Sequence, residues 1–222
     1  DDGIRDPLWS RGLGDVYKRQ LYWGLSTVES NIFSGQSVGK VNRLLATNDQ
    51  LDLVVFGNSR ANHHVVNSEF SQNSYNVGMD GTGPKTAAIL VQTLANREQL
   101  LLFHIDYFEL FSDRYTGKDS LRLINKLNVI ENLGKELLEL DPSKVYLSSI
   151  LKLSVYQGKV LGILYRAFSG QKQDDYLGFE PLESLTRTKR EGGIQKQEPN
   201  VRQQENHELN ELTNKALESV VR

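Results

Sequence analysis

Ser59 is the residue whose surroundings point most directly to chemistry. It follows the segment LDLVVF at 51–56, in which five of six residues are apolar, and lies in the sequence GNSR at 57–60. The apolar run predicts a buried strand of a parallel sheet, and the glycine allows a sharp exit from it. A helix that begins near Ala61, capped by Asn58 or Ser59, would hold the hydroxyl at the carboxyl edge of the sheet, where open α/β folds bind ligands. There a hydroxyl can act as a nucleophile, beside amides that stabilise negative charge.

A second glycine-rich turn follows the next predicted strand. Residues 74–84 read SYNVGMDGTGP, and an apolar helical pattern continues to about residue 96. Consecutive strands of a parallel sheet deliver their exits to the same edge. We therefore expect small residues and free backbone amides from both turns to meet there.

These two blocks resemble the SGNH (GDSL-like) hydrolase superfamily, in particular its exported or membrane-anchored bacterial branch. The matching residues are Gly57-Asn58-Ser59-Arg60 and the Asn-x-Gly-x-x-Gly pattern at 76–81, and the resemblance covers roughly residues 50–110. It implies that Ser59 is the nucleophile and that the amides of Ser59 and Gly81 stabilise the oxyanion. Substrate-binding or supporting positions implied by the resemblance are Asn58, Arg60, Asn76 and Asp106.

The same resemblance implies a reaction and a location. It points to ester hydrolysis or acyl transfer without a cofactor, on a small-molecule or glycan ester such as an acylated cell-envelope glycan. A periplasmic or membrane-anchored protein is implied, with the anchor outside these residues. The alternatives are a non-catalytic binding or assembly protein on the same fold and, last, a phosphate or nucleotide binder that uses the turn at 78–83, which lacks the lysine of a P-loop.

Two blocks of the superfamily are missing. No Asp-x-x-His occurs in the chain, so the triad's acid and base are not recognisable, and we expect little activity from these residues alone. The third block, Gly-x-Asn-Asp, is replaced by a sequence in which Asp106 stands near the expected place. An ionised carboxylate cannot donate a hydrogen bond, which leaves two oxyanion donors.

Each of these residues also has a purely structural interpretation, which stays open. Ser59 could serve only as a helix cap, and Arg60 could pair with Asp80 or Asp106 rather than with an anionic substrate. Of the four histidines, His104 fits a core position better than a catalytic base. His63 and His64 lie on the helix after Ser59, and His207 is expected in solvent. No set of metal ligands is recognisable, so no metal is expected.

Composition describes one domain with enough apolar residues for a core. The 222 residues are 38% hydrophobic and 24% charged, with a formal net charge of −2 and no cysteine. The near-neutral balance argues against nucleic acid as a partner, and the absence of cysteine excludes disulfides and thiol chemistry. No apolar run approaches the ~20 residues of a membrane-spanning helix.

The elements that position the site follow a strand–helix alternation, which predicts a three-layer, flavodoxin-like α/β sandwich with a parallel sheet and an inserted helical segment. Strands are expected at 51–57, 74–78 and 99–106, and helices at 37–47, 61–70, 84–96 and 207–221. Two long amphipathic helices are expected at 118–140 and 148–168, followed by a polar loop at 171–200.

The ends of the chain differ from the rest. Residues 1–20 show no periodicity and resemble sequencing-adaptor read-through, so we interpret them as a non-native scar; a natural irregular arm is the alternative. Residues 21–35 read as an irregular lead-in. Because the last predicted helix should lead into a fourth strand, we interpret 21–222 as an incomplete domain.

Overall fold

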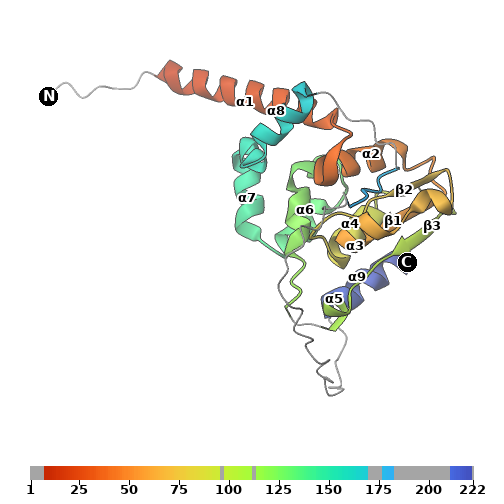
Figure 1. The fold of residues 1–222 in the computed structure, drawn as a ribbon. Coiled ribbons are helices and arrows are strands. Elements are labelled where there is room, and N and C mark those ends of the chain that lie inside the picture. Colours follow the sequence, from red (N-terminus) through yellow and green to blue (C-terminus); the bar gives the residue numbers. More distant parts are fainter. Residues whose placement is uncertain (1–7, 96–97, 112–113, 170–176, 183–210, 222) are drawn as a thin grey trace, which may run out of the picture.

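The protein is a mixed α/β structure built on a small parallel sheet. The computed structural model describes residues 8–95, 98–111, 114–169, 177–182 and 211–221. Its three strands have the order β2-β1-β3, with β1 (Leu53–Phe56) between β2 (Ser74–Asn76) and β3 (Leu100–Phe103) (Figure 1). Both pairings are parallel, and Val54 stands opposite Tyr75 on one side and Leu101 on the other. The predicted α/β class and parallel strands are therefore confirmed.

Helices make up most of the described chain. In chain order they are α1 (Leu8–Ser30), the π-helical turn η1 (Gly35–Gly39), α2 (Lys40–Thr47), α3 (Ser59–His64), the 3₁₀ turn η2 (Asn67–Glu69), α4 (Pro84–Val91), α5 (Tyr107–Phe111), the 3₁₀ helix η3 (Lys118–Lys126), α6 (Leu133–Leu138), α7 (Pro142–Ile150), the 3₁₀ turn η4 (Lys152–Tyr156), α8 (Val160–Phe168) and α9 (Glu211–Val221). No described helix is long and apolar enough to cross a membrane.

The central strand β1 is buried on both faces. Val54 and Phe56 belong to the main core, which includes residues of α2, α4 and the helical segment after β3. Leu53 and Val55 face the other way and pack against Ala61 of α3. The helices that follow β1 and β2 thus lie on opposite faces of the sheet, as right-handed crossovers in opposite directions require.

Strand β3 differs from the buried strand that its apolar run predicts. Leu100 is 67% exposed and Leu102 is 39% exposed; they share one face of β3, at the edge of the described sheet, and that face is less covered than the face of Leu101 and Phe103. The strand also ends at Phe103, short of the predicted residue 106. An apolar run therefore identified the strand without revealing its place in the sheet.

The two long helices predicted after β3 are wrong, and a series of short helices takes their place. Asn132 adopts φ +58° before α6, and Gly158 adopts φ +74° before α8. Between them, Pro142 opens α7, whose first turn is capped by the Asp141 side chain. Left-handed residues and proline interrupt the i→i−4 hydrogen bonds of an α-helix, so the leucine spacing alone could not extend it.

Helix α1 was not predicted: residues 1–20 were interpreted as a scar or arm without periodicity and 21–35 as an irregular lead-in, yet the described residues from Leu8 to Ser30 are helical. Its inner face holds Leu25 and the carboxylate of Glu29, both buried. Glu29 Oε1 lies 2.6 Å from the Lys126 ammonium of η3, and both side chains are at most 5% exposed. A buried ion pair thus anchors the end of α1, while residues 15–20 are exposed on the part of α1 that projects from the body of the molecule (Figure 1).

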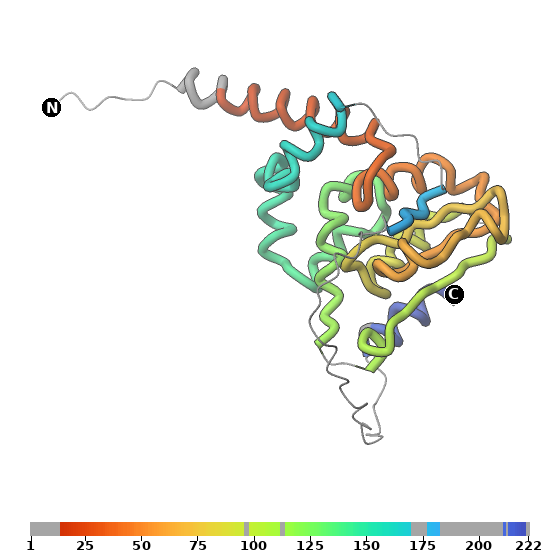
Figure 2. Tube along the Cα trace, viewed as in Figure 1, coloured from red at the N-terminus to blue at the C-terminus, as the bar shows by residue number. Residues whose placement is uncertain are grey.

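Only 177–182 of the predicted polar loop at 171–200 lies in the described part of the chain, and it is docked rather than solvated. The amide of Asn76 donates to the Leu177 carbonyl at 2.9 Å, and the amide of Glu180 donates to the Asn62 carbonyl at 3.1 Å. Figure 2 shows this segment, in light blue, beside the strands. Gly178 has φ +86°, and a Cβ there would lie 2.3 Å from the Asn76 carbonyl oxygen. Only glycine allows this close approach.

Candidate active site at the carboxyl edge of the sheet

The turn after β1 leaves the Ser59 hydroxyl exposed to solvent. Gly57 adopts φ +149°, and a Cβ there would lie 2.8 Å from the His104 carbonyl oxygen, so the exit from β1 requires glycine. The Asn58 side chain caps α3 by accepting a hydrogen bond from the Arg60 amide at 2.9 Å. Helix α3 therefore begins at Ser59, two residues before the predicted start, and the cap is Asn58. Ser59 is exposed, and its hydroxyl makes no hydrogen bond to the described residues.

Asn76 holds the turn after β2 against α3. Its side chain is completely buried, and Nδ2 donates to the carbonyls of Ala61 at 2.8 Å and Val65 at 3.0 Å. Its Oδ1 accepts from the Gly78 amide at 2.9 Å. Every polar atom of this side chain is thus used inside the fold, which makes Asn76 a positioning residue rather than a substrate contact.

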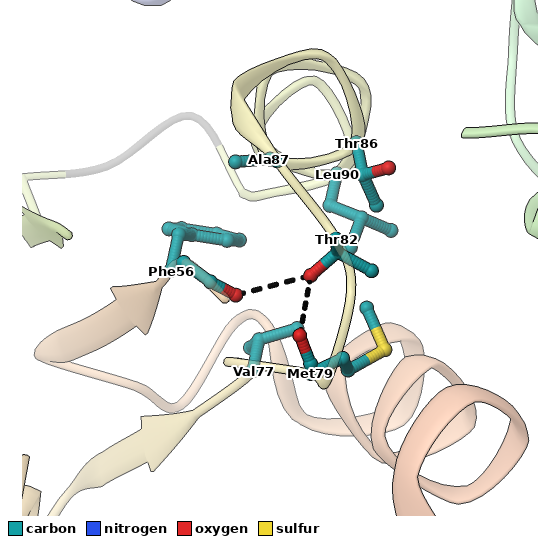
Figure 3. A pocket seen from close by; sticks show the side chains of 9 residues that line it. Phe56, Val77, Met79, Thr82, Thr86, Ala87 and Leu90 are labelled. Atoms are coloured by element: carbon teal, nitrogen blue, oxygen red, sulfur yellow. Dashed lines mark hydrogen bonds between the residues drawn. The ribbon is translucent and has the colours of Figure 1, made fainter. Parts of the chain in front are cut away.

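The two turns meet at the carbonyl oxygen of Gly57. The Met79 amide donates to it at 3.1 Å, and the Thr82 hydroxyl lies 3.1 Å from it and 2.8 Å from the Met79 carbonyl (Figure 3). Gly81 lies between Met79 and Thr82, exposed and at φ +65°. Neither the Ser59 amide nor the Gly81 amide donates a hydrogen bond within the described residues. The structure therefore brings both turns to one edge with two amides available to an anion.

A pocket beneath the turns is too small for a substrate. It is lined by Phe56, Met79, Thr82 and Leu90 among others, and its free volume is about 10 Å³ (Figure 3). That is about the space that a single water molecule needs. A substrate of Ser59 would therefore lie on the open edge above the turns, not in this pocket.

Asp106 joins Asn58 and Arg60 in one network. Its Oδ1 lies 2.5 Å from Arg60 Nη1, and its Oδ2 accepts from Asn58 Nδ2 at 2.5 Å. Of the alternatives for Arg60, the ion pair with Asp106 is therefore present. Asn58 Nδ2 also donates to Glu109 Oε1 at 3.2 Å, so both amide hydrogens are used and Asn58 offers no third oxyanion donor.

Glu109 was missed in the sequence. It lies on α5, and its Oε2 accepts from the Asp106 amide at 3.1 Å, which is the reciprocal half of a capping box. Burial raises the pKa of Glu109, and the neighbouring Asp106 charge adds to this; hydrogen bonds from Asp106 and Asn58 offset part of the rise. The spacing Asp106-x-x-Glu109 was the signal that could have identified it.

His63 lies one helical turn after Ser59, but both of its ring nitrogens are engaged. Nδ1 lies 2.6 Å from the Glu180 carbonyl, and Nε2 lies 3.1 Å from Asp80 Oδ1. Residues four apart on a helix are neighbours on its surface, so His63 is close to Ser59. In this arrangement it has no free nitrogen to accept the proton of the hydroxyl.

Asp80 is the centre of a polar cluster that the sequence did not reveal. Gln36 Nε2 donates to its Oδ2 at 3.0 Å and Asn62 Nδ2 to its Oδ1 at 3.2 Å. Burial alone would raise the pKa of Asp80, but these hydrogen bonds and the His63 charge outweigh it and lower the pKa. The buried Lys40 ammonium donates to Asn62 Oδ1 and, at 2.6 Å, to the Gly78 carbonyl. The cluster fixes α2, α3 and the second turn relative to one another.

The remaining histidines do not supply a base in the described structure. His64 is exposed, and His104 Nδ1 is buried without a hydrogen-bond partner. His207, like the basic stretch at 187–191, lies outside the described residues. Within the described chain, no group of three or more His, Cys, Asp or Glu side chains could hold a metal ion.

Comparisons with protein-family models, curated proteins and solved structures found no match to this chain. An exposed hydroxyl at a helix N-terminus can attack a carbonyl carbon, and amides beside it that make no hydrogen bond within the described residues can stabilise the resulting oxyanion.

Proposed function

We propose that the edge formed by the turns of Ser59 and Gly81 is an ester hydrolase or acyltransferase site on a flavodoxin-like α/β sandwich of the SGNH type. The observation that carries the proposal is that the Ser59 hydroxyl and the amides of Ser59 and Gly81 make no hydrogen bonds within the described residues. The Gly57 carbonyl of the first turn accepts from the Met79 amide and the Thr82 hydroxyl of the second turn, which holds the two turns side by side. The strand order β2-β1-β3 is compatible with the flavodoxin-like arrangement.

In the proposed reaction, Ser59 Oγ attacks the ester carbonyl carbon while a base removes the hydroxyl proton. The carbonyl oxygen becomes an oxyanion that the two amides stabilise, and collapse of this intermediate expels the alcohol with a proton. An acyl-serine ester remains, and water or an acceptor hydroxyl then takes the acyl group. Because both ring nitrogens of His63 are engaged, we expect the acylation step to be slow.

The proposed substrate is an acylated glycan of the cell envelope, acted on in the periplasm or at the membrane. The family resemblance supports this class, and so does the open edge, because a bulky sugar needs no deep pocket there. No cofactor and no nucleic acid enters the proposal. Arg60 would support the site through Asp106 rather than contact the substrate.

A non-catalytic binding or assembly role is the second candidate. The engaged nitrogens of His63 and the closed network of Asp106 favour it, since neither group is poised to move a proton. In that case the same two amides would hold a carbonyl or carboxylate ligand without attack by Ser59.

Chemical rescue separates the two functions. Hydrolysis of 4-nitrophenyl acetate would be followed with increasing imidazole for the unchanged chain, Ser59→Ala and Ser143→Ala. Ser143 is the control, because it is also an exposed serine in the capped first turn of a helix, although its hydroxyl donates to Asp141 Oδ1 at 2.7 Å. The proposal expects imidazole to accelerate the unchanged chain and Ser143→Ala above the level of Ser59→Ala. Equal rates for all three would reject it in favour of binding.

A further inference from the structure

The helical segment after β3 carries an outward apolar stripe that the proposed ester site does not use. On α8, Leu161 is 83% exposed and Phe168 is 85% exposed, with Tyr165 between them. Their spacing of four and three residues places them on one side of the helix, while Ile163 on the other side is buried. An isolated exposed leucine is ordinary on a protein surface, but a stripe of this size is not.

The neighbouring helix α7 repeats the pattern. Tyr146 and Ile150 are four residues apart and exposed, Ile150 to 78%, whereas Val145 and Ser148 are buried. Leu151 continues the exposed residues at the end of the helix. Helices α7 and α8 form one flank of the molecule, well separated from β3 (Figure 1). We call Tyr146, Ile150, Leu151, Leu161, Tyr165 and Phe168 the outward stripe.

The segment that carries the outward stripe has charges of a single sign in its own sequence. Residues 142–168 contain no aspartate and no glutamate but contain Lys144, Lys152, Lys159 and Arg166. Lys144 and Lys152 are exposed, although the Lys152 ammonium lies 5.7 Å from the centroid of the Tyr22 ring of α1. Lys159 is partly buried and donates to the Arg122 carbonyl at 3.1 Å. The nearest preceding acid, Asp141, is turned back onto the first turn of α7 as its cap.

The behaviour of Lys159 agrees with a locally positive field. Burial lowers the pKa of its ammonium, and the charges of Lys144, Lys126 and Arg122 lower it further, although Glu29 acts in the opposite sense. Lys144, Lys126 and Arg122 thus lie close enough to Lys159 to act on its charge, with Glu29 as the opposing acid.

We propose that the outward stripe of α7 and α8 is a peripheral docking surface for an anionic lipid bilayer. Leucine, isoleucine and aromatic side chains enter the boundary between headgroups and acyl chains, and lysines beside them meet lipid phosphates. Tyrosine suits this depth because its ring is apolar and its hydroxyl is polar. The helices lie on the membrane and do not cross it.

Charge selects the bilayer over a second copy of the chain. A symmetric dimer through this flank would bring Lys144 and Lys152 of one copy toward the same residues of the other, with no acid in 142–168 to pair with them. An anionic membrane satisfies the same lysines and covers the same apolar side chains.

Vesicle co-sedimentation of the full chain tests the proposal. Vesicles of phosphatidylcholine alone would be compared with vesicles containing equal parts of phosphatidylglycerol. We expect binding to the anionic vesicles, weakened as sodium chloride is raised, and much less binding to phosphatidylcholine. Leu161→Gln/Phe168→Gln should weaken binding by about tenfold or more because it removes two inserted side chains.

Two further variants make the test specific. Phe70→Gln is the matched control, because Phe70 is 70% exposed but lies on the turn after α3, away from the stripe; it should bind like the unchanged chain. Lys144→Glu/Lys152→Glu should abolish the preference for anionic vesicles, and thermal unfolding would verify that every variant is folded.

Three results would overturn the proposal. They are no sedimentation with either vesicle, equal loss of binding in the Phe70 control, and a concentration-dependent dimer in size-exclusion chromatography that Leu161→Gln/Phe168→Gln dissociates. None of these results depends on esterase activity, so the docking surface and the proposed ester site stand or fall separately.

Discussion

Replacing Asn58 should reveal how the edge of the sheet is held together. Its Oδ1 caps α3 through the Arg60 amide, and its Nδ2 donates to carboxylate oxygens of Asp106 and Glu109. Loss of an N-cap costs about 1 kcal/mol. Hydrogen bonds to charged groups contribute about 1.5–3 kcal/mol each, and Asp106 keeps its ion pair with Arg60, so the lower end applies. We expect Asn58→Ala to lower the free energy of unfolding by about 4 kcal/mol.

Asn58→Ser separates the two contributions. Serine can still cap the helix but cannot reach the two carboxylates, so the loss should be about 3 kcal/mol. Urea unfolding at neutral pH, followed by far-ultraviolet circular dichroism, gives both values on a common scale. Asp141→Ala is the control. Asp141 caps α7 and accepts one further bond, from the exposed Ser143 hydroxyl at 2.7 Å, so its loss should be smaller. If Asn58→Ser is as stable as the unchanged chain, the bonds from the Asn58 amide to the two carboxylates do not stabilise the fold.

Other predictions concern backbone, ion pairs and pH. Gly57→Ala should cost at least ~2 kcal/mol because its Cβ would meet a carbonyl oxygen at a positive φ. Gly24→Ala, with nothing within 4 Å in the middle of α1, should instead stabilise by about 0.5–1 kcal/mol; urea unfolding measures both, and equal effects would contradict the distinction. Lys126→Met should lower the free energy of unfolding by about 3–5 kcal/mol because Glu29 would remain buried and unpaired; a neutral effect would mean that this charge reaches solvent. Since the pKa of Asp80 lies below its ordinary 3.8, its carboxylate stabilises the fold above that pH and stops doing so as the pH falls through the lowered value. Asp80→Asn should therefore show a shallower loss of stability on acidification, and an unchanged acid limb would refute this role.

The local features of the site could be read from the sequence because neighbouring residues decide them. The apolar run at 51–56 predicted β1, and the glycine and asparagine after it predicted the exit and the cap. Asn76 and Gly81 were placed in the second turn for the same reason. These local signals suffice to place the Ser59 hydroxyl at the edge of the sheet.

The rest depends on contacts between distant residues. Glu180 reaches His63 across more than a hundred positions, and no local pattern announces it. Glu29 and Lys126 look like surface residues, so α1 gave no apolar face wide enough to predict. The run that formed β3 was recognised as a strand, but its exposed edge position depends on which neighbours pair with it. Of the site residues that the sequence analysis missed, only Glu109 carried a local signal, the capping-box spacing from Asp106.

The central claim is that the turns of Ser59 and Gly81 form an ester site with Ser59 as its nucleophile, and site-resolved labelling tests it most directly. The full chain would be treated with a fluorophosphonate, with and without imidazole, and the adduct on each serine followed over time by peptide mass spectrometry. We predict that Ser59 is labelled faster than Ser143 and that imidazole accelerates its labelling, because the amides of Ser59 and Gly81 stabilise the phosphoryl oxygen while the external base takes the proton. Labelling of Ser59 no faster than Ser143, with or without imidazole, would contradict the account.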